Sequence, residues 1–311
     1  MTTPIAVTIA GSDSSGGAGI QADLKTFSAL GVYGASVITA LTAQNTRGVT
    51  AIHDVPAHFI AAQIDAVFSD LKVNAVKIGM LSVPVAIATV AAGLERWSQT
   101  LVVLDPVMVA TSGDRLLAPA AIEVLKRDLI PRALVVTPNL HEAAALLDEP
   151  LARDESEMRG QAEKLLRIGA KAVLIKGGHA QGPEAVDLLV TPEAAARLST
   201  EKIDTANTHG TGCTLSSAIA AGLAKGYRLS EAVADAKNYV TQAIAAADEI
   251  ATCEARHAFL LPPGVKVMRR SPPLPDLQLV GRRDRLSHII LRVGHGFGEP
   301  IALGKACRDR G

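Results

Sequence analysis

The chain has 311 residues, and its 31 lysines and arginines are balanced by 31 aspartates and glutamates. This balance argues against a nucleic acid partner, because proteins that bind the phosphate backbone carry an excess of basic residues. No apolar run is long enough to span a membrane and no secretion signal opens the chain, so we expect a cytoplasmic protein without a membrane partner. Three scattered cysteines, Cys213, Cys253 and Cys307, favour a reducing compartment over a disulfide framework or a zinc site.

Short apolar runs alternate with amphipathic segments up to about residue 249, an order typical of a mostly parallel sheet covered by helices on both faces. Apolar residues make up 48 % of the chain and aromatic residues only 3 %, which suits such an α/β fold better than an aromatic stacking surface. The predicted strands cover residues 5–10, 35–43, 75–78, 101–104, 133–136, 172–175, 185–190 and 201–204. The predicted helices cover residues 18–30, 57–70, 83–96, 119–129, 141–147, 155–168, 215–225 and 230–249.

The segment from Gly11 to Asp23 follows the first predicted strand and opens the first helix, and it is dense in glycine and polar residues. Its match to the dinucleotide-binding pattern is weak. The next acidic residue after Asp23 is Asp54, which is too far along the chain to be the carboxylate that binds the ribose in that pattern. It is not a P-loop either, since no Gly-Lys-Ser/Thr follows. We interpret it as a substrate loop, and the alternative is a glycine turn needed only for strand–helix packing.

Polar side chains also follow other predicted strands, at the edge of the sheet where ligands bind in parallel α/β folds. Gln44 offers a carboxamide that can pair with the edge of a heterocycle, and Asp105 offers a carboxylate that suits Mg²⁺ or its water shell. Asn139 and Glu142 begin a helix that can face the same cleft as Asp105, and Lys176 can reach nucleotide phosphates. Taken singly, these residues could instead end turns or cap helices, and Asn is a favoured N-cap.

The segment Asn207-Thr208-His209-Gly210-Thr211-Gly212-Cys213-Thr214 lies where a predicted strand turns into a helix. Backbone N–H groups at such a helix start, with the helix dipole behind them, favour a bound anion, and glycine lets the anion approach closely. The dipole is also expected to lower the pKa of the Cys213 thiol. An anion site beside a proton acceptor is what phosphoryl transfer to a hydroxyl needs. Two alternatives stay open: a buried structural cysteine, or a nucleophilic pair with His209.

The composition changes after about residue 252, where Pro262-Pro263-Gly264 and Pro272-Pro273 are followed by Arg282, Arg283 and Arg285. Proline-rich polar segments bury too little apolar surface to fold alone. We therefore predict one domain over residues 1–251 and an irregular tail over residues 252–311. The alternative is a tail that packs on a partner subunit.

Taken together, these segments resemble the hydroxymethylpyrimidine/phosphomethylpyrimidine kinases of the ribokinase-like superfamily. The matching motifs occur in family order and span residues 5 to about 249. They are the Gly-rich loop from Ala10 to Lys25, Thr39-Ala40-Leu41-Thr42-Ala43-Gln44-Asn45-Thr46, Val76-Lys77-Ile78-Gly79-Met80-Leu81, Leu104-Asp105-Pro106-Val107-Met108, Thr137-Pro138-Asn139 with Glu142, Lys176-Gly177-Gly178-His179, and Thr208-His209-Gly210-Thr211-Gly212-Cys213.

The resemblance implies an ATP- and Mg²⁺-dependent kinase that acts twice. It first phosphorylates the hydroxymethyl oxygen of 4-amino-5-hydroxymethyl-2-methylpyrimidine, and it then phosphorylates that phosphate to the diphosphate. The pyrimidine pocket that the resemblance implies is formed by Gly11, Asp23, Gln44, Met80 and Val107. A homodimer is implied as well.

The resemblance also implies where ATP and Mg²⁺ bind. Mg²⁺ is expected at Asp105 and Glu142, and ATP at Lys176, Asn139 and Thr208. The implied catalytic residues are Cys213, Gly210, Thr211, Gly212 and Lys176. Relatives in the superfamily that phosphorylate sugars carry Asp where Cys213 stands, so a thiolate would serve as a weaker base for the first phosphorylation.

The end of the chain departs from the family pattern. Family chains usually finish with a Gly-His-Gly-rich stretch soon after the last long helix, whereas the similar Val293–Gly298 is displaced here by residues 252–291. Three alternative functions remain at this stage. They are a pyridoxal or pyridoxine kinase on the same fold, a pyrimidine-binding regulatory protein without turnover, and a cysteine-dependent hydrolase.

Overall fold

The computed structural model describes residues 2–45, 47–108, 116–178, 183–205, 208–246, 248–251 and 256–259. All described elements lie within one compact unit, Met1–Val265. Most of the predicted tail, including Val293–Gly298, lies outside the described residues, as do Asn207 and His179 of the sequence motifs. The division at residue 251 therefore stays a prediction. Among the described helices, none is both long and apolar enough to cross a membrane.

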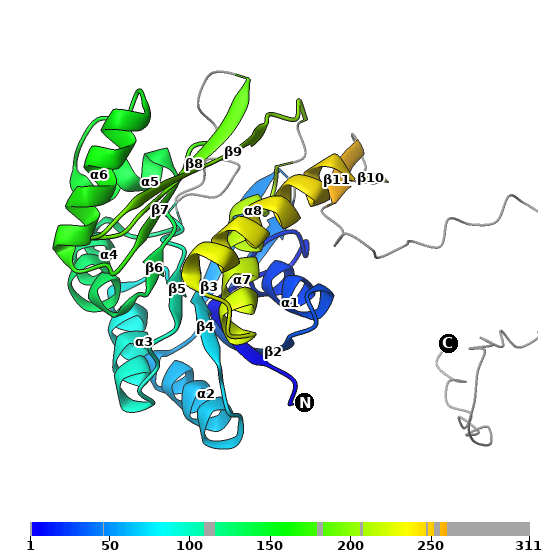
Figure 1. Ribbon diagram of the computed structural model, residues 1–311. Helices are drawn as coiled ribbons and strands as arrows, with labels where there is room; N and C mark the ends of the chain where they lie inside the picture. Colours follow the sequence, from blue (N-terminus) through cyan, green and yellow to red (C-terminus); the bar gives the residue numbers. More distant parts are fainter. Residues whose placement is uncertain are drawn as a thin grey trace, which may run out of the picture. The chain divides into compact units, whose positions relative to one another are not determined.

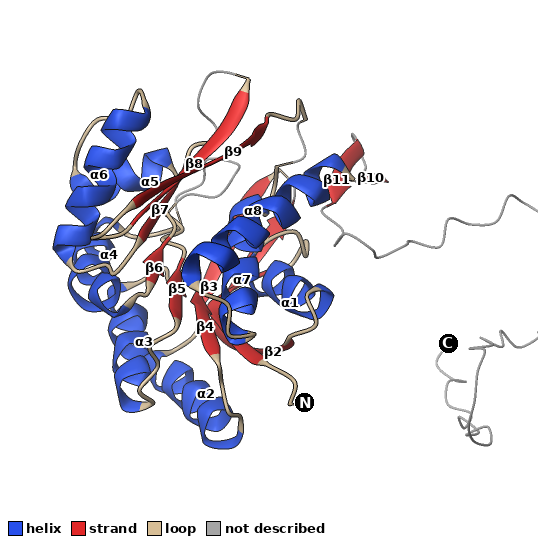
Figure 2. Cartoon of the chain, in the orientation of Figure 1, coloured by secondary structure: helices blue, strands red, loops and turns tan. Residues whose placement is uncertain are grey.

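A sheet lies between two layers of helices, which confirms the predicted α/β class (Figures 1 and 2). The strands are β1 (Ile5–Asp13), β2 (Tyr33–Asn45), β3 (Gly48–Asp54), β4 (Ala75–Ile78), β5 (Val102–Leu104), β6 (Val135–Val136), β7 (Val173–Lys176), β8 (Glu184–Val190), β9 (Ala195–Glu201), β10 (Asp248–Ala251) and β11 (Arg256–Phe259). The helices are α1 (Gly19–Ala29), α2 (Ala57–Asp70), α3 (Pro84–Arg96), α4 (Pro119–Val124), α5 (Leu140–Leu147), α6 (Glu155–Ile168), α7 (Thr211–Ala224) and α8 (Leu229–Ala245). A π-helical turn, Leu125–Leu129, and a 3₁₀ turn, Ile130–Arg132, follow α4.

The strand order in the main sheet is β3-β2-β1-β4-β5-β6-β7-β8-β9. The six central strands, β2-β1-β4-β5-β6-β7, run parallel. Strand β3 extends one edge and β8 and β9 extend the other, all by antiparallel pairing. Strand β1 lies between β2 and β4, so the chain builds the sheet outward in both directions from β1. Ligands bind at such switch points, outside the carboxyl ends of the strands.

Alternation along the inner strands divides the core into two layers, because successive side chains point to opposite faces. In β4, Val76 and Ile78 pack with α2 to α6, whereas Ala75 packs with α1, α7 and α8. The same division holds in β5, where Val103 faces the second group of helices. Both faces are buried, which explains why these strands read as short continuous apolar runs.

Several predicted boundaries were wrong. Helix α7 begins at Thr211 rather than at residue 215, because Gly210 adopts φ +80° and becomes the N-cap. Strand β9 ends at Glu201, so the strand predicted over 201–204 is wrong beyond its first residue. Helix α8 ends at Ala245 rather than at residue 249. The last residues of the predicted helix belong instead to β10, which pairs with β11. Edge strands β3 and β9 have largely exposed side chains, so they lack the apolar pattern that predicts a strand.

A buried ion pair joins the sheet to the helix layer formed by α1, α7 and α8. Lys77 in β4 faces the same layer as Ala75, and its Nζ lies 2.9 and 2.8 Å from the two carboxylate oxygens of Asp23 in α1. The hydroxyl groups of Thr8 in β1 and Ser217 in α7 donate to the same carboxylate, each over 2.6 Å. Both charged side chains are fully buried, yet every oxygen of Asp23 has partners, as a buried charge requires.

Replacing Lys77 with Met should destabilise the protein severely, because the buried Asp23 carboxylate would lose its counter-charge. We expect a loss of about 3–5 kcal/mol in the free energy of unfolding, measured by urea titration. The control is Arg159→Met, which removes an exposed i,i+4 ion pair with Glu163 and should cost about 0.5 kcal/mol or less. Similar losses in the two variants would contradict the proposed importance of the buried pair.

Candidate active site

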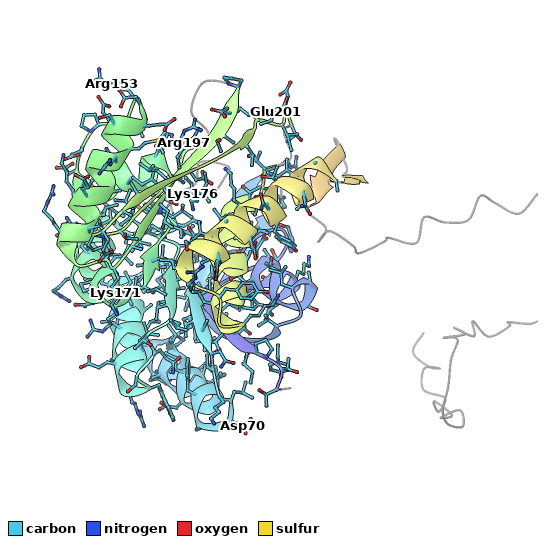
Figure 3. All side chains as sticks on the ribbon, viewed as in Figure 1. Asp70, Arg153, Lys171, Lys176, Arg197 and Glu201 are labelled. Carbon is cyan, nitrogen blue, oxygen red and sulfur yellow. The ribbon has the colours of Figure 1, made fainter. Side chains whose placement is uncertain are left out.

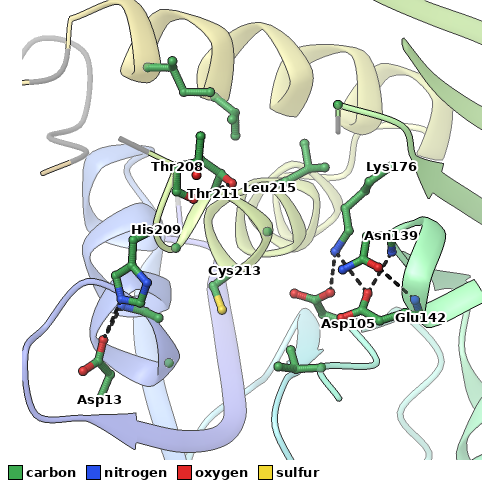
Figure 4. Close-up of a pocket in the computed structure, with 18 of the residues that line it drawn as sticks. Asp13, Asp105, Asn139, Glu142, Lys176, Thr208, His209, Thr211, Cys213 and Leu215 are labelled. Carbon is green, nitrogen blue, oxygen red and sulfur yellow. Dashed lines mark hydrogen bonds and ion pairs between the residues drawn. The ribbon is translucent and has the colours of Figure 1, made fainter. Parts of the chain in front are cut away.

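A cavity of about 830 Å³ lies at the carboxyl ends of the parallel strands, against the start of α7 (Figure 4). All but one of the site residues that the sequence predicts line this cavity. They are Gly11, Gln44, Met80, Asp105, Val107, Asn139, Glu142, Lys176, Thr208, Gly210, Thr211, Gly212 and Cys213. These residues come from the ends of six strands, β1, β2, β4, β5, β6 and β7, and from the starts of α5 and α7, and the parallel topology brings them to one place.

Asp23 is the exception, and its predicted contact with the pyrimidine needs correction. Its side chain is fully buried beneath the cavity floor, and its carboxylate is already bound by Lys77, Thr8 and Ser217. Lys77 itself lines the cavity. The sequence assigned no role to this lysine, although a charged residue between Val76 and Ile78 in a buried strand was the available signal.

Asp105 and Lys176 form a second buried ion pair at the centre of the cavity. Asp105 directly follows β5, Lys176 is the last residue of β7, and the Lys176 Nζ lies 2.8 Å from Asp105 Oδ1. The Lys176 side chain is 13 % exposed and is labelled near the middle of the view in Figure 3, whereas Arg153, just before α6, lies at the edge of the view and is 85 % exposed. Burial acts to lower the pKa of Lys176, but the charges of Asp105 and Glu142 raise it above its usual value. The ammonium is therefore a fixed positive charge in the cavity.

Glu142 lies on the other side of Lys176 and is fixed by a capping box. The Asn139 side chain accepts from the Glu142 N–H, and Glu142 Oε2 accepts from the Asn139 N–H, each over 2.8 Å. The same Oε2 lies 3.8 Å from Lys176 Nζ. Burial and the nearby Asp105 raise the pKa of Glu142 to about 7, although Lys176 opposes that shift. The prediction that Asn139 caps a helix and the prediction that it faces the cleft both agree with its position.

The donor set around Lys176 fits a partly hydrated Mg²⁺ that arrives with a nucleotide. Asp105 and Glu142 supply two carboxylates that line the cavity and lie 2.8 and 3.8 Å from Lys176 Nζ, and Mg²⁺ is commonly held by one or two carboxylates, waters and substrate phosphates. The described residues contain no group of three or more acidic, His or Cys side chains that could hold a metal by themselves. A metal here would thus depend on phosphate oxygens and waters for its remaining ligands.

The first turn of α7 approaches the Asp105–Lys176 pair closely. A Cβ built on Gly212 would lie 3.3 Å from Lys176 Nζ and 3.9 Å from Asp105 Oδ2. A Cβ on Gly210 would lie 1.9 Å from the Gly17 carbonyl oxygen, so the two glycine-rich loops are in direct backbone contact. The N–H groups of Gly212 and Cys213, at the start of α7, have no acceptors within the helix and suit an anion in the cavity, whereas the Thr211 N–H donates to the Thr208 carbonyl over 3.2 Å.

Cys213 lies in the first turn of α7, as predicted, but its thiol is not acidic. Burial raises the pKa of Cys213 to about 11, and Asp23 and Asp105 act in the same direction, while Lys77 opposes them. The expectation that the helix start lowers this pKa was wrong, because loss of solvation outweighs the dipole. At neutral pH the thiol is protonated in the ligand-free site.

A second set of contacts holds the Gly-rich loop after β1. Asp13 accepts from Ser15 N–H and Ala18 N–H, each over 2.8 Å, and its Oδ2 lies 3.3 Å from Nε2 of His209. Burial acts to raise the pKa of Asp13, but the hydrogen bonds from His209 and Ser15 lower it to about 2. Figure 4 shows His209 turned toward Asp13 and away from Cys213, so the pairing of Cys213 with His209 is not favoured.

The family of the chain follows from comparison with known proteins. A model of the family described as phosphomethylpyrimidine kinase matches residues 13–256. The hydroxymethylpyrimidine/phosphomethylpyrimidine kinase of Rhizobium meliloti (strain 1021) is 62 % identical over 254 residues, which cover 82 % of this chain and 95 % of that protein. The protein of the same name from Escherichia coli (strain K12) is 52 % identical, over 82 % of this chain and 94 % of its own length.

Solved structures agree with this relationship. The phosphomethylpyrimidine kinase of Clostridium difficile 630 is 48 % identical with a TM-score of 0.70, over 78 % of this chain and 100 % of that one. An ADP complex of Bacillus subtilis pyridoxal kinase is 37 % identical with a TM-score of 0.77, over 83 % of this chain and 98 % of that one. On the match of the family model and the close relatives, the chain belongs to the phosphomethylpyrimidine kinase family, with a ribokinase-like fold.

Proposed function

We propose that the protein is an ATP-dependent kinase of thiamine biosynthesis that phosphorylates 4-amino-5-hydroxymethyl-2-methylpyrimidine and then its monophosphate. One observation carries the proposal: the buried Asp105–Lys176 pair lies beside the first turn of α7, in the same cavity as Gln44. A positive charge, a carboxylate and helix N–H groups are the parts that phosphoryl transfer requires. Family membership and relatives named as this kinase support the substrate assignment.

The pyrimidine end of the cavity combines polar side chains, Thr42 and Gln44, with an apolar wall. The Thr42 hydroxyl lies 3.1 Å from Gln44 Oε1 and 2.8 Å from the Ser12 carbonyl oxygen, and the N–H groups of the Gln44 carboxamide suit the edge of a heterocycle. Met80 packs in an apolar cluster with Val107 and comes so close to Gly11 that a Cβ there would lie 2.7 Å from Met80 Cε. We expect the ring between Met80 and Val107, with its edge on Gln44.

The phosphate end is organised around Lys176. We expect Lys176 to contact ATP phosphates, and the N–H groups of Gly212 and Cys213 to stabilise charge on the transferred group. Asp105 and Glu142 would hold Mg²⁺, which supplies neutralising charge for the phosphates when it is bound. Asn139 and Thr208 line the same end of the cavity and are proposed nucleotide contacts. Leu215, Val240 and Ile244 offer an apolar surface for the adenine.

Cys213 is proposed as the proton acceptor of the first phosphorylation, in which a neutral hydroxyl attacks. Because burial keeps most of the thiol protonated at neutral pH, the group that accepts this proton is the small thiolate fraction, which the charge of Lys77 favours and the charges of Asp23 and Asp105 oppose. In the second phosphorylation the acceptor is already an anionic phosphate, so no base is needed. The two reactions should therefore depend on Cys213 to different degrees.

A second candidate function is pyridoxal phosphorylation. The pyridoxal kinase of Bacillus subtilis superposes with a TM-score of 0.77, against 0.70 for the phosphomethylpyrimidine kinase of Clostridium difficile, although its sequence identity is lower. Both substrates present a hydroxymethyl group on an aromatic ring. We also propose, from the family resemblance, that the protein acts in the cytoplasm as a homodimer.

Purified protein should consume ATP when supplied with hydroxymethylpyrimidine, and the products should include the monophosphate and then the diphosphate. Parallel reactions with pyridoxal test the second candidate. Reactions without added Mg²⁺, in the presence of EDTA, should lose activity because the phosphate charge is no longer neutralised. Binding of the pyrimidine without ATP consumption would instead support the non-catalytic alternative.

Replacing Cys213 with Ala should reduce kcat for the hydroxymethyl substrate by about 100-fold or more, the usual contribution of a general base. For the monophosphate substrate we expect less than about a tenfold loss, because that acceptor needs no deprotonation. Cys213→Ser is the matched control for side-chain volume. Equal losses on the two substrates would exclude the proposed role.

The reactivity of the thiol provides a separate test of its protonation state. In a Cys253→Ser/Cys307→Ser background, alkylation of Cys213 by iodoacetamide should be slow at pH 8 and should still rise above pH 9, because burial holds its pKa at about 11. Mass spectrometry follows the modification, with free N-acetylcysteine as the reference thiol. A rate that levels off below pH 8 would show that the helix start and Lys77 lower the pKa of Cys213 by more than burial raises it.

A further inference from the structure

A third buried ion pair lies in the cavity wall and has no role in the site as described so far. Lys237 in α8 and Asp187 in β8 both line the cavity, and Lys237 Nζ lies 2.8 Å from Asp187 Oδ2. Their side chains are 11 % and 7 % exposed. Charged groups are rarely buried to this extent unless they are paired, as these two are.

The second carboxylate oxygen of Asp187 holds the backbone directly after Lys176. Asp187 lies opposite Lys176 in the register of β7 and β8, and its Oδ1 accepts the Gly177 N–H over 3.0 Å. A charged acceptor makes this hydrogen bond stronger than one between neutral groups. A Cβ on Gly177 would lie 2.3 Å from the Val186 carbonyl oxygen, so the turn after Lys176 is pressed against β8.

Lys176 is therefore fixed at both ends. Its ammonium is bound by Asp105, and the Gly177 N–H that follows it is bound by Asp187. The charge of Asp187 is balanced by Lys237 of helix α8. When a nucleotide draws the Lys176 ammonium toward phosphate oxygens, the contact with Asp105 must loosen. The anchor at Gly177 would then be what keeps the base of the side chain in place.

We propose that Asp187, held by Lys237, is a positioning residue that orients Lys176 toward the phosphates of ATP. The inference rests on the proposed kinase function, because it assigns Lys176 to the nucleotide. It extends that function by assigning a role to a residue pair that contacts neither the pyrimidine end of the cavity nor the reacting hydroxyl. Small misplacements of a charged group that binds phosphate are costly, since much of the catalytic effect comes from preorganised charge.

The test is a double-mutant cycle on ATP affinity, measured by calorimetry on the full-length protein in the presence of Mg²⁺. Asp187→Ala should weaken ATP binding about tenfold in the wild-type background. In a Lys176→Ala background the same change should cost less than about twofold, because its effect acts through Lys176. The dissociation constant for the pyrimidine should change by less than about twofold in both backgrounds.

Two further variants separate positioning from loss of folding. Asp187→Asn combined with Lys237→Met keeps an acceptor for the Gly177 N–H and removes both charges, so it should fold and recover most of the ATP affinity. Glu184→Gln is the control on the same strand, since Glu184 pairs only with surface groups such as Arg197 and does not line the cavity. Its ATP affinity should equal that of the wild type.

Additive losses from Asp187→Ala and Lys176→Ala would overturn the proposal, as would equal weakening of ATP and pyrimidine binding. An Asp187→Asn/Lys237→Met protein that folds but binds ATP as weakly as Asp187→Ala would also overturn it. Failure of the wild-type protein to consume ATP would instead contradict the proposed kinase function, so the two failures are distinguishable.

Discussion

Two buried aspartates, each paired with a buried lysine, hold helix α7 against the sheet. Ser217 donates to Asp23, which binds Lys77, and the preceding residue, Ser216, donates over 3.1 Å to Asp105, which binds Lys176. Removing any one charge leaves its partner buried without compensation, so the two charges of each pair are retained or lost together. The position of the proposed anion-binding turn of α7, one turn earlier in the helix, depends on this arrangement.

The same constraint connects stability with chemistry. Asp105 fixes α7 through Ser216 and also holds Lys176 in the cavity, so the carboxylate that is expected to organise Mg²⁺ is also structural. Lys77 is paired with Asp23, yet it lies at the cavity floor where its charge acts on Cys213. Backbone contact between Gly17 and Gly210 brings the two glycine-rich loops together above these pairs. The cavity is thus built on rigid elements, and positioned charge rather than an acidic thiol dominates its electrostatics.

Much of the α/β core was predictable, because buried parallel strands appear as short apolar runs and their helices as amphipathic segments. The bounds of α2, β4 and α6 agree with the sequence-based prediction. The failures have physical causes. Strands β3 and β9 are exposed edges with little apolar pattern, and α7 starts at glycine residues that normally end helices. Asp23 was predicted to contact the substrate because its position in the motif can be recognised from the sequence. The burial of its side chain cannot be recognised in that way.

The sequence by itself determined the residue types at the strand ends, and the parallel topology it encodes was enough to predict that they would share one cavity. Only the tertiary structure decided what each of them does there. It placed Asp23 beneath the cavity with Lys77, and it buried the Cys213 thiol enough to raise its pKa. It also joined Asp187 and Lys237 across 50 positions of the chain. The reason is that solvation and pairing of charge depend on neighbours from distant segments, which no local sequence pattern specifies.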